Sequence, residues 1–198
     1  LSCNDIIGTE GGFQFYSPAS AVNIWRCGLA AKAAEAVSEG KPTVIFMAAD
    51  HKCWSWHLHT PTETRLCYMS TLANGASVWY GLHSASNLIK GATGEAVREL
   101  VHFDKKHEKI YRDTSPASEA ALLFSIASEK ICSTKREETD FYSQGETAGS
   151  GCVSNYSEAF NGAAGLLFRS GISFDLATEL NIDSIFGPDQ RYGVPGHE

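Results

Sequence analysis

The chain has 198 residues, of which 43% are hydrophobic, and its 16 Lys and Arg against 23 Asp and Glu give a net charge of −7. This composition supplies enough apolar surface for a packed core and excludes a disordered, collagen-like or highly charged tail protein. The acidic balance, with one small basic cluster at Lys105, Lys106 and Lys109, argues against nucleic acid or a membrane surface as partner.

The chain's N-terminus and its cysteines indicate the cellular compartment and whether the sequence is part of a longer protein. No apolar run reaches the roughly 18 residues of a membrane span, and the N-terminus lacks the sections of a signal peptide. Because the chain starts at Leu1 and enters strand-like sequence almost at once, we expect it to begin inside a longer protein. The six scattered cysteines do not form a disulfide framework and favour a reducing compartment such as the cytoplasm. We expect Cys27 and Cys67 to act as small hydrophobic residues.

The first two predicted elements are a strand at residues 5–9 and a long helix at residues 17–39. Ser17 supplies the N-cap, Pro18 suits the first helical position, and Gly40 provides the stop. The helix spacing predicts one buried apolar face. Its members are Val22, Trp25, Leu29, Ala33 and Val37.

The same plan follows twice more. Residues 43–47 form a continuous apolar run typical of a parallel strand buried on both faces. Thr60 and Glu63 then predict a capping box that starts a helix, and residues 76–80 form a third strand before a helix at 93–112. The predicted inward positions of these two helices are Leu66, Met69, Leu72 and Ala73 in the first, and Val97, Leu100, Val101, Ile110 and Tyr111 in the second.

The strand starts recur after roughly 35 residues, the length of one βα unit, so right-handed crossovers should make the strands parallel. The pattern changes after Asp113, where a linker leads to a strand at 120–126 and then a polar stretch at 133–154. A helix beginning at Asn155 and a strand at 172–177 complete a second βαβ unit. We therefore predict an α/β protein with domains at residues 1–113 and 114–198.

Candidate chemistry collects where the first three strands end, which is where parallel α/β folds place their sites. Trp and His beside carboxylates are typical of a sugar site, since flat apolar faces stack on a pyranose while acids and imidazoles take its hydroxyls and move protons. We predict Glu10 and Asp50 as the catalytic pair, because glycoside hydrolysis requires two carboxyl groups. The predicted substrate-binding residues are His51, Trp54, Trp56, His57 and Trp79.

Other interpretations of these residues stay open. Glu10 can instead bond backbone amides in a tight turn, Asp50 can be a loop cap, and Trp79 can be a core residue. A zinc site at His51, His57 and His59 is an alternative, although the ligand spacing is loose. Neither a nucleophile elbow near residue 152 nor a phosphate-binding loop at residues 91–94 has the required context, so we expect no cofactor and no metal.

Five segments together resemble a known arrangement. They are GTEGGFQF (8–15), GKPTVIFMAAD (40–50), ETRLCYMSTLANGASVWYG (63–81), SPASEAALLFSIASEKI (115–131) and YSEAFNGAAGLLFRSGISFDLATE (156–179). They resemble beta-galactosidase-like glycoside hydrolases, in which a (β/α)8 barrel is followed by a flavodoxin-like trimerisation domain. The resemblance implies barrel strands six to eight in residues 1–113, the start of the trimerisation domain in 114–198, and a trimeric parent protein. A fragment of this kind should expose apolar edges and faces and be inactive alone.

One departure from that family matters. Its nucleophile is a Glu at the end of strand seven, but here that strand ends at Ala48-Ala49-Asp50. Either Asp50 substitutes, or the pair resembles that of fucosidase-like barrels, with Glu10 as acid/base and an upstream Asp as nucleophile. The prediction is thus a glycoside hydrolase acting on a carbohydrate substrate. The alternatives are a carbohydrate-binding or assembly protein that lost its nucleophile, and a metal-dependent hydrolase.

Overall fold

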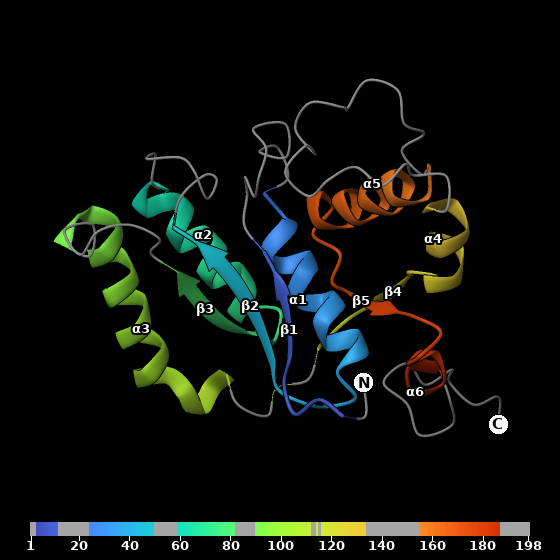
Figure 1. Cartoon of the computed structure of the whole chain (residues 1–198), viewed down its shortest axis with the longest axis horizontal. Helices are drawn as coiled ribbons and strands as arrows, with labels where there is room; N and C mark the ends of the chain where they lie inside the picture. Colours follow the sequence, from blue (N-terminus) through green and yellow to red (C-terminus); the bar gives the residue numbers. More distant parts are fainter. Residues whose placement is uncertain are drawn as a thin grey trace. The chain divides into compact units, whose positions relative to one another are not determined.

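The computed structural model describes residues 3–11, 24–49, 59–81, 90–111, 114, 116–133 and 155–186 (Figure 1). The chain divides into two compact units, Leu1–Ser115 and Pro116–Glu198, and each is treated by itself. Among the described helices, none combines the length and the apolar character that crossing a membrane requires.

The first unit is a three-stranded parallel sheet with helices between and after its strands. The strands lie in the order β1-β2-β3 and pair in parallel, which confirms the predicted parallel βα repeat. The elements are β1 (Ile7–Glu10), α1 (Arg26–Val37), β2 (Thr43–Ala48), α2 (Pro61–Leu72), β3 (Ser77–Gly81) and α3 (Ala92–Tyr111).

The two faces of this sheet differ sharply. Side chains alternate between faces along a strand, and on β2 the residues Ile45 and Met47 are buried while Phe46 between them is 37% exposed. The buried side packs against α1 and α2 in one core that consists of Cys27, Ala31, Ala34, Ile45, Met47, Cys67 and Ala76. Cys27 and Cys67 are fully buried in it, which confirms their predicted role as small hydrophobic residues. All the described helix packing is therefore on one face, because right-handed crossovers between consecutive neighbouring strands keep to one side.

The start of α2 is set by the predicted capping box. The Thr60 hydroxyl accepts a hydrogen bond from the Glu63 amide at 3.2 Å, and the Thr60 amide donates to the Glu63 carboxylate at 2.7 Å. Both bonds satisfy amides that the first helical turn leaves without partners. The prediction is confirmed, and Gly40, with φ of 79°, also follows the end of α1 as expected.

The predicted helix faces were partly wrong. Ala33 is exposed, as are Leu66, Val101 and Ile110, at 43%, 47% and 67%. Small residues face the sheet instead, since close helix–sheet contact leaves little room for bulk. In α2 the fully buried Thr64 shares a hydrogen bond of 2.9 Å with the hydroxyl of Tyr80. The first helix was predicted at 17–39 but is shorter, Arg26–Val37, with residues 24 and 25 in a turn; the predicted N-cap Ser17 lies outside the described residues.

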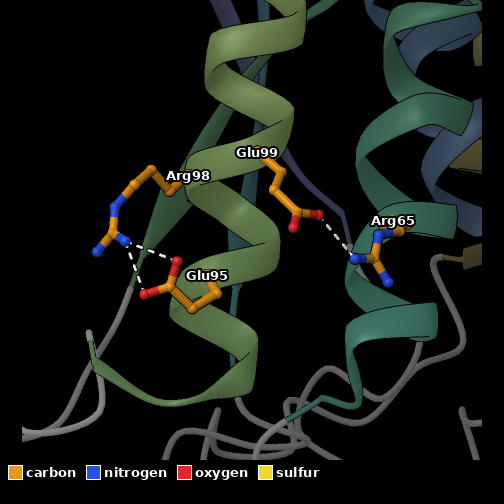
Figure 2. Close-up of polar contacts among 4 residues, drawn as sticks. All are labelled: Arg65, Glu95, Arg98 and Glu99. Atoms are coloured by element: carbon orange, nitrogen blue, oxygen red, sulfur yellow. Dashed lines mark hydrogen bonds and ion pairs between the residues drawn. The ribbon is translucent and has the colours of Figure 1, made fainter.

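Surface ion pairs join α2 to α3 and brace α3 itself. Figure 2 shows Arg65 of α2 reaching Glu99 of α3 at 2.8 Å, and Arg98 holding Glu95 of the same helix at 2.6 Å. All four side chains are about half exposed or more, so each pair adds little to stability. The Arg65–Glu99 pair links α2 to α3, whereas the Arg98–Glu95 pair lies within α3.

The second unit is built on a parallel pair of strands. Its elements are β4 (Ala120–Leu123), α4 (Ile126–Ser133), α5 (Asn155–Arg169), β5 (Phe174–Ala177) and α6 (Ile182–Phe186). All four residues of β5 are buried, and Phe174 meets Phe168 of α5 edge to face at 5.0 Å. The strand predicted at 120–126 is shorter, because a helix that the sequence analysis missed begins at Ile126. Ser125 caps it by accepting the Ser128 amide at 3.1 Å.

Candidate functional site

The carboxyl ends of β1, β2 and β3 meet at one edge of the first sheet. There the Gly11 amide donates to the Phe46 carbonyl and the Ala49 amide donates to the Gly81 carbonyl, both at 2.8 Å. Gly11, Ala49 and Gly81, each the last described residue of its range, therefore all lie at this edge. It is the edge at which parallel α/β folds place their ligands.

A row of three side chains crosses the face of the sheet that the described helices do not cover. The Cα of Glu10 is in register with that of Phe46, and the Cα of Phe46 with that of Trp79. In-register residues of neighbouring parallel strands point to the same face, and all three are exposed. Two of the sequence-predicted site residues, Glu10 and Trp79, are thus brought onto one face.

The tight turn that the sequence left open for Glu10 is described only as far as Gly11, and Gly12 lies outside the described residues. The amide of Gly11 donates to the Phe46 carbonyl rather than to the Glu10 side chain. Within the described part of the chain, no hydrogen bond or ion pair holds this carboxylate. The side chain of Glu10 is exposed.

Trp79 lies within β3 with 53% of its surface exposed, so it is not a core residue of this chain. Its ring meets Phe46 edge to face, with centroids 5.7 Å apart and an interplanar angle of 76°. Sequence reasoning did not select Phe46. The available signal was its place in the run TVIFM, whose strand period of two sets Phe46 on the face opposite Ile45 and Met47.

The remaining predicted residues of this site, Asp50, His51, Trp54, Trp56 and His57, lie outside the described residues. The two ends of their segment are well fixed, however. The His59 amide donates to the Ala49 carbonyl at 2.6 Å, and the Thr93 hydroxyl of α3 donates to the His59 carbonyl at 2.7 Å. Ala49 and His59, which flank the segment, are thus hydrogen-bonded to each other at the carboxyl edge of the sheet.

The zinc alternative depended on three histidines. His59 is 2% exposed, and over residues 3–11, 24–49, 59–81 and the other described ranges no three His, Cys, Asp or Glu side chains gather to hold a metal ion. The other two histidines of the alternative belong to the segment at 50–58. The zinc reading therefore remains a hypothesis from the sequence.

A strongly perturbed titratable group lies on the opposite, helix-covered side of the sheet. Burial and then the charge of Asp104 raise the pKa of Tyr68 to about 12. The Tyr68 hydroxyl donates to Asp104 of α3 at 3.4 Å, and its ring packs against Leu72 and Leu100. Because perturbed groups can also mark structural contacts, we assign this one to the α2–α3 interface.

In the second unit, a carboxylate that follows β5 accepts hydrogen bonds from the segment between β4 and α4 and from the first turn of α4. Glu179, two residues beyond β5, accepts hydrogen bonds from the Ser125 hydroxyl at 2.6 Å, the Ile126 amide at 2.9 Å and the Ala127 amide at 3.3 Å. The Ser125 hydroxyl first, and the Ile126 amide next, lower the pKa of Glu179 to about 2. An anion at a helix N-terminus is favoured by the free amides and the dipole, and here the chain supplies that anion itself.

Comparison with known proteins finds a structural likeness but no sequence relative. No protein-family model matches the chain, and a search of curated protein sequences also finds no match. Among solved structures, the chain resembles alpha-L-fucosidase isoenzyme 2 from Paenibacillus thiaminolyticus, with a TM-score of 0.51 and 20% sequence identity. The likeness covers 78% of this chain and 21% of the fucosidase, so the chain spans about a fifth of that protein. The chain therefore shares its mixed α/β fold with part of a glycoside hydrolase.

Proposed function

We propose that this chain is the carboxyl-terminal part of a glycoside hydrolase barrel joined to the beginning of a flavodoxin-like trimerisation domain. Three consecutive parallel strands with all described helix packing on one face support the barrel, since a singly wound sheet of this kind curls into a (β/α)8 fold. The fold likeness to part of a fucosidase supports the same assignment. The parent protein would hydrolyse O-glycosidic bonds of a carbohydrate substrate.

The observation that carries the proposal is the row of Glu10, Phe46 and Trp79 on the open face of the sheet. An exposed indole offers a flat apolar surface for the C–H face of a sugar, and a carboxyl group beside it can transfer a proton. We assign Glu10 the acid/base role and Trp79 the stacking role. His51, Trp54, Trp56 and His57 belong to the segment that starts from the same edge, and in this proposal they complete the sugar subsite.

The nucleophile has two candidates. In the first, Asp50 takes the place of the Glu that ends strand seven in beta-galactosidase-like enzymes. In the second, the nucleophile is an Asp on a strand upstream of Leu1, as in fucosidase-like barrels. The likeness to a fucosidase favours the second arrangement, so we expect an α-fucoside to be a better substrate than a β-galactoside.

The test is hydrolysis of a panel of aryl glycosides, including α-fucosides and β-galactosides, by the full-length polypeptide that carries this sequence. Glu10→Gln should lower the rate by about 10² to 10⁴, the usual value of a general acid–base group. The loss should be larger for substrates with poorer leaving groups, because these depend most on protonation of the leaving oxygen. Glu39→Gln is the matched control, since Glu39 is exposed and precedes β2, at the amino ends of the strands.

Two results would reject the assignment. Full activity of Glu10→Gln on a substrate that the parent cleaves would remove Glu10 from the catalytic pair. Sugar binding without cleavage of any substrate would instead favour a carbohydrate-binding protein, consistent with Ala48 and Ala49 at the end of β2 where related enzymes carry a Glu.

A further inference from the structure

We infer that Phe46 and Gly81 are positioning residues, which together hold the indole of Trp79 as a stacking surface for a neutral sugar ring. The inference rests on the proposed function and extends it to two residues that donate no side-chain hydrogen bond. Neither contacts the sugar as an acid or a base. Both act through the orientation of Trp79.

Phe46 holds the indole from the neighbouring strand. Its ring meets Trp79 edge to face at 5.7 Å, the geometry in which the positive edge of one aromatic ring faces the negative face of another. Phe46 is itself held from the other side. A β-carbon at Gly8 of β1 would lie 2.6 Å from Cε2 of Phe46, so the phenyl ring occupies the space that this glycine leaves free.

Gly81 sets the direction in which the indole leans. A β-carbon built at Gly81 would lie 2.7 Å from Cζ3 and 2.9 Å from Cη2 of Trp79. The six-membered ring of Trp79 therefore lies over Gly81, the last residue of β3, and so toward the carboxyl edge of the sheet. A side chain at this position would push the indole away from that edge.

These contacts leave a large part of Trp79 available, since 53% of its surface is exposed. Glu10 lies in the same row two strands away, so its Cα is about 10 Å from that of Trp79 at the usual spacing of about 4.8 Å between strands. One sugar residue can bridge that interval. The chemistry selects a neutral pyranose with an apolar C–H face, because a carboxylate beside the stacking surface repels an acidic sugar.

The experiment is a double-mutant cycle on the full-length polypeptide. Binding of methyl α-fucoside and methyl β-galactoside is measured by calorimetry for the parent, Phe46→Leu, Gly81→Ala, Trp79→Ala and the combinations of each with Trp79→Ala. Near-ultraviolet circular dichroism of the free proteins reports the environment of Trp79. The controls are Phe103→Leu, whose ring meets His107 and Tyr111 on α3, and Gly162→Ala, where a β-carbon meets nothing within 4 Å.

We expect Phe46→Leu and Gly81→Ala each to change the indole dichroism and to weaken sugar binding about three- to tenfold, the range of one aromatic contact. Both effects should vanish in the Trp79→Ala background and be absent from the controls. If Phe46→Leu or Gly81→Ala still weakens sugar binding in the Trp79→Ala background, the positioning role is contradicted. It is also contradicted if Phe46→Leu and Gly81→Ala leave binding unchanged while Trp79→Ala loses affinity. If no variant, Trp79→Ala included, alters sugar affinity, the proposed site itself is wrong.

Discussion

Replacing two adjacent residues of β2 should have very different effects on the stability of the 198-residue chain. Ile45 is fully buried on the helix side, and its truncation to Ala should cost about 2–5 kcal/mol of unfolding free energy. Phe46 is 37% exposed on the other face. Although a core Phe→Ala change costs about 3–5 kcal/mol, here the loss should be about 1–2 kcal/mol, mainly the contact with Trp79.

Urea denaturation followed by far-ultraviolet circular dichroism measures both values. Ile110→Ala is the control, since that side chain is 67% exposed and should change stability by less than about 0.5 kcal/mol. Equal losses for Ile45→Ala and Phe46→Ala would refute the reasoning, because they would mean that both faces of the sheet are covered.

Three further predictions concern single contacts. Thr60→Ala should cost about 1 kcal/mol by removing the capping box, whereas Thr62→Ala, exposed in the same turn, should be nearly neutral in the same urea assay. The pKa of Glu179 is lowered to about 2, so its ionised carboxylate contributes stability that is present above the ordinary carboxyl pKa and is lost as the pH falls toward 2. Glu179→Gln should therefore make the stability of the second unit less dependent on acid pH, and an unchanged acid-unfolding profile would contradict this. The pKa of Tyr68 is raised to about 12, so the free energy of unfolding should fall as the pH rises from 10 toward 12. Tyr68→Phe should remove this pH dependence. It should also remove, from the ultraviolet absorbance titration, a phenol that ionises near pH 12.

The strands and most helices could be predicted because their signals are local. The apolar run at residues 43–47 and the Thr60 capping box each depend on a few neighbouring residues. The buried helix faces could not be predicted in the same way, because packing against the sheet selects small residues such as Ala31 and Thr64. The helical spacing of large apolar side chains, on which the prediction was based, does not reveal them. Helix α4 was missed although its N-cap Ser125 and its first-turn Glu129 are local signals, because the apolar residues 120–126 were taken as one continuous strand.

The candidate site was predictable in its residue types but not in its arrangement. Glu10 and Trp79 stand out in the sequence because carboxylate, imidazole and indole side chains gather around the ends of the first three predicted strands. In the sequence, Phe46 is indistinguishable from the other apolar residues of its strand. Its contact with Trp79 follows from the register between the two strands. Register between parallel strands is set by packing across the sheet rather than by any local signal, so the central member of the row emerges only from the structure.

Two carboxylates at the ends of parallel strands illustrate how the fold assigns chemistry. Glu179 accepts three hydrogen bonds at the start of α4, and these bonds hold it ionised down to a pKa of about 2, so it cannot deliver a proton near neutral pH. Its role is to join β5 to α4. Glu10 occupies the corresponding end of β1, but the amide of Gly11 that follows it is taken by the Phe46 carbonyl. Because the sheet itself satisfies that amide, it is not available to the Glu10 carboxylate, and Glu10 shares the exposed row with Phe46 and Trp79, which is where the proposed acid/base role places it.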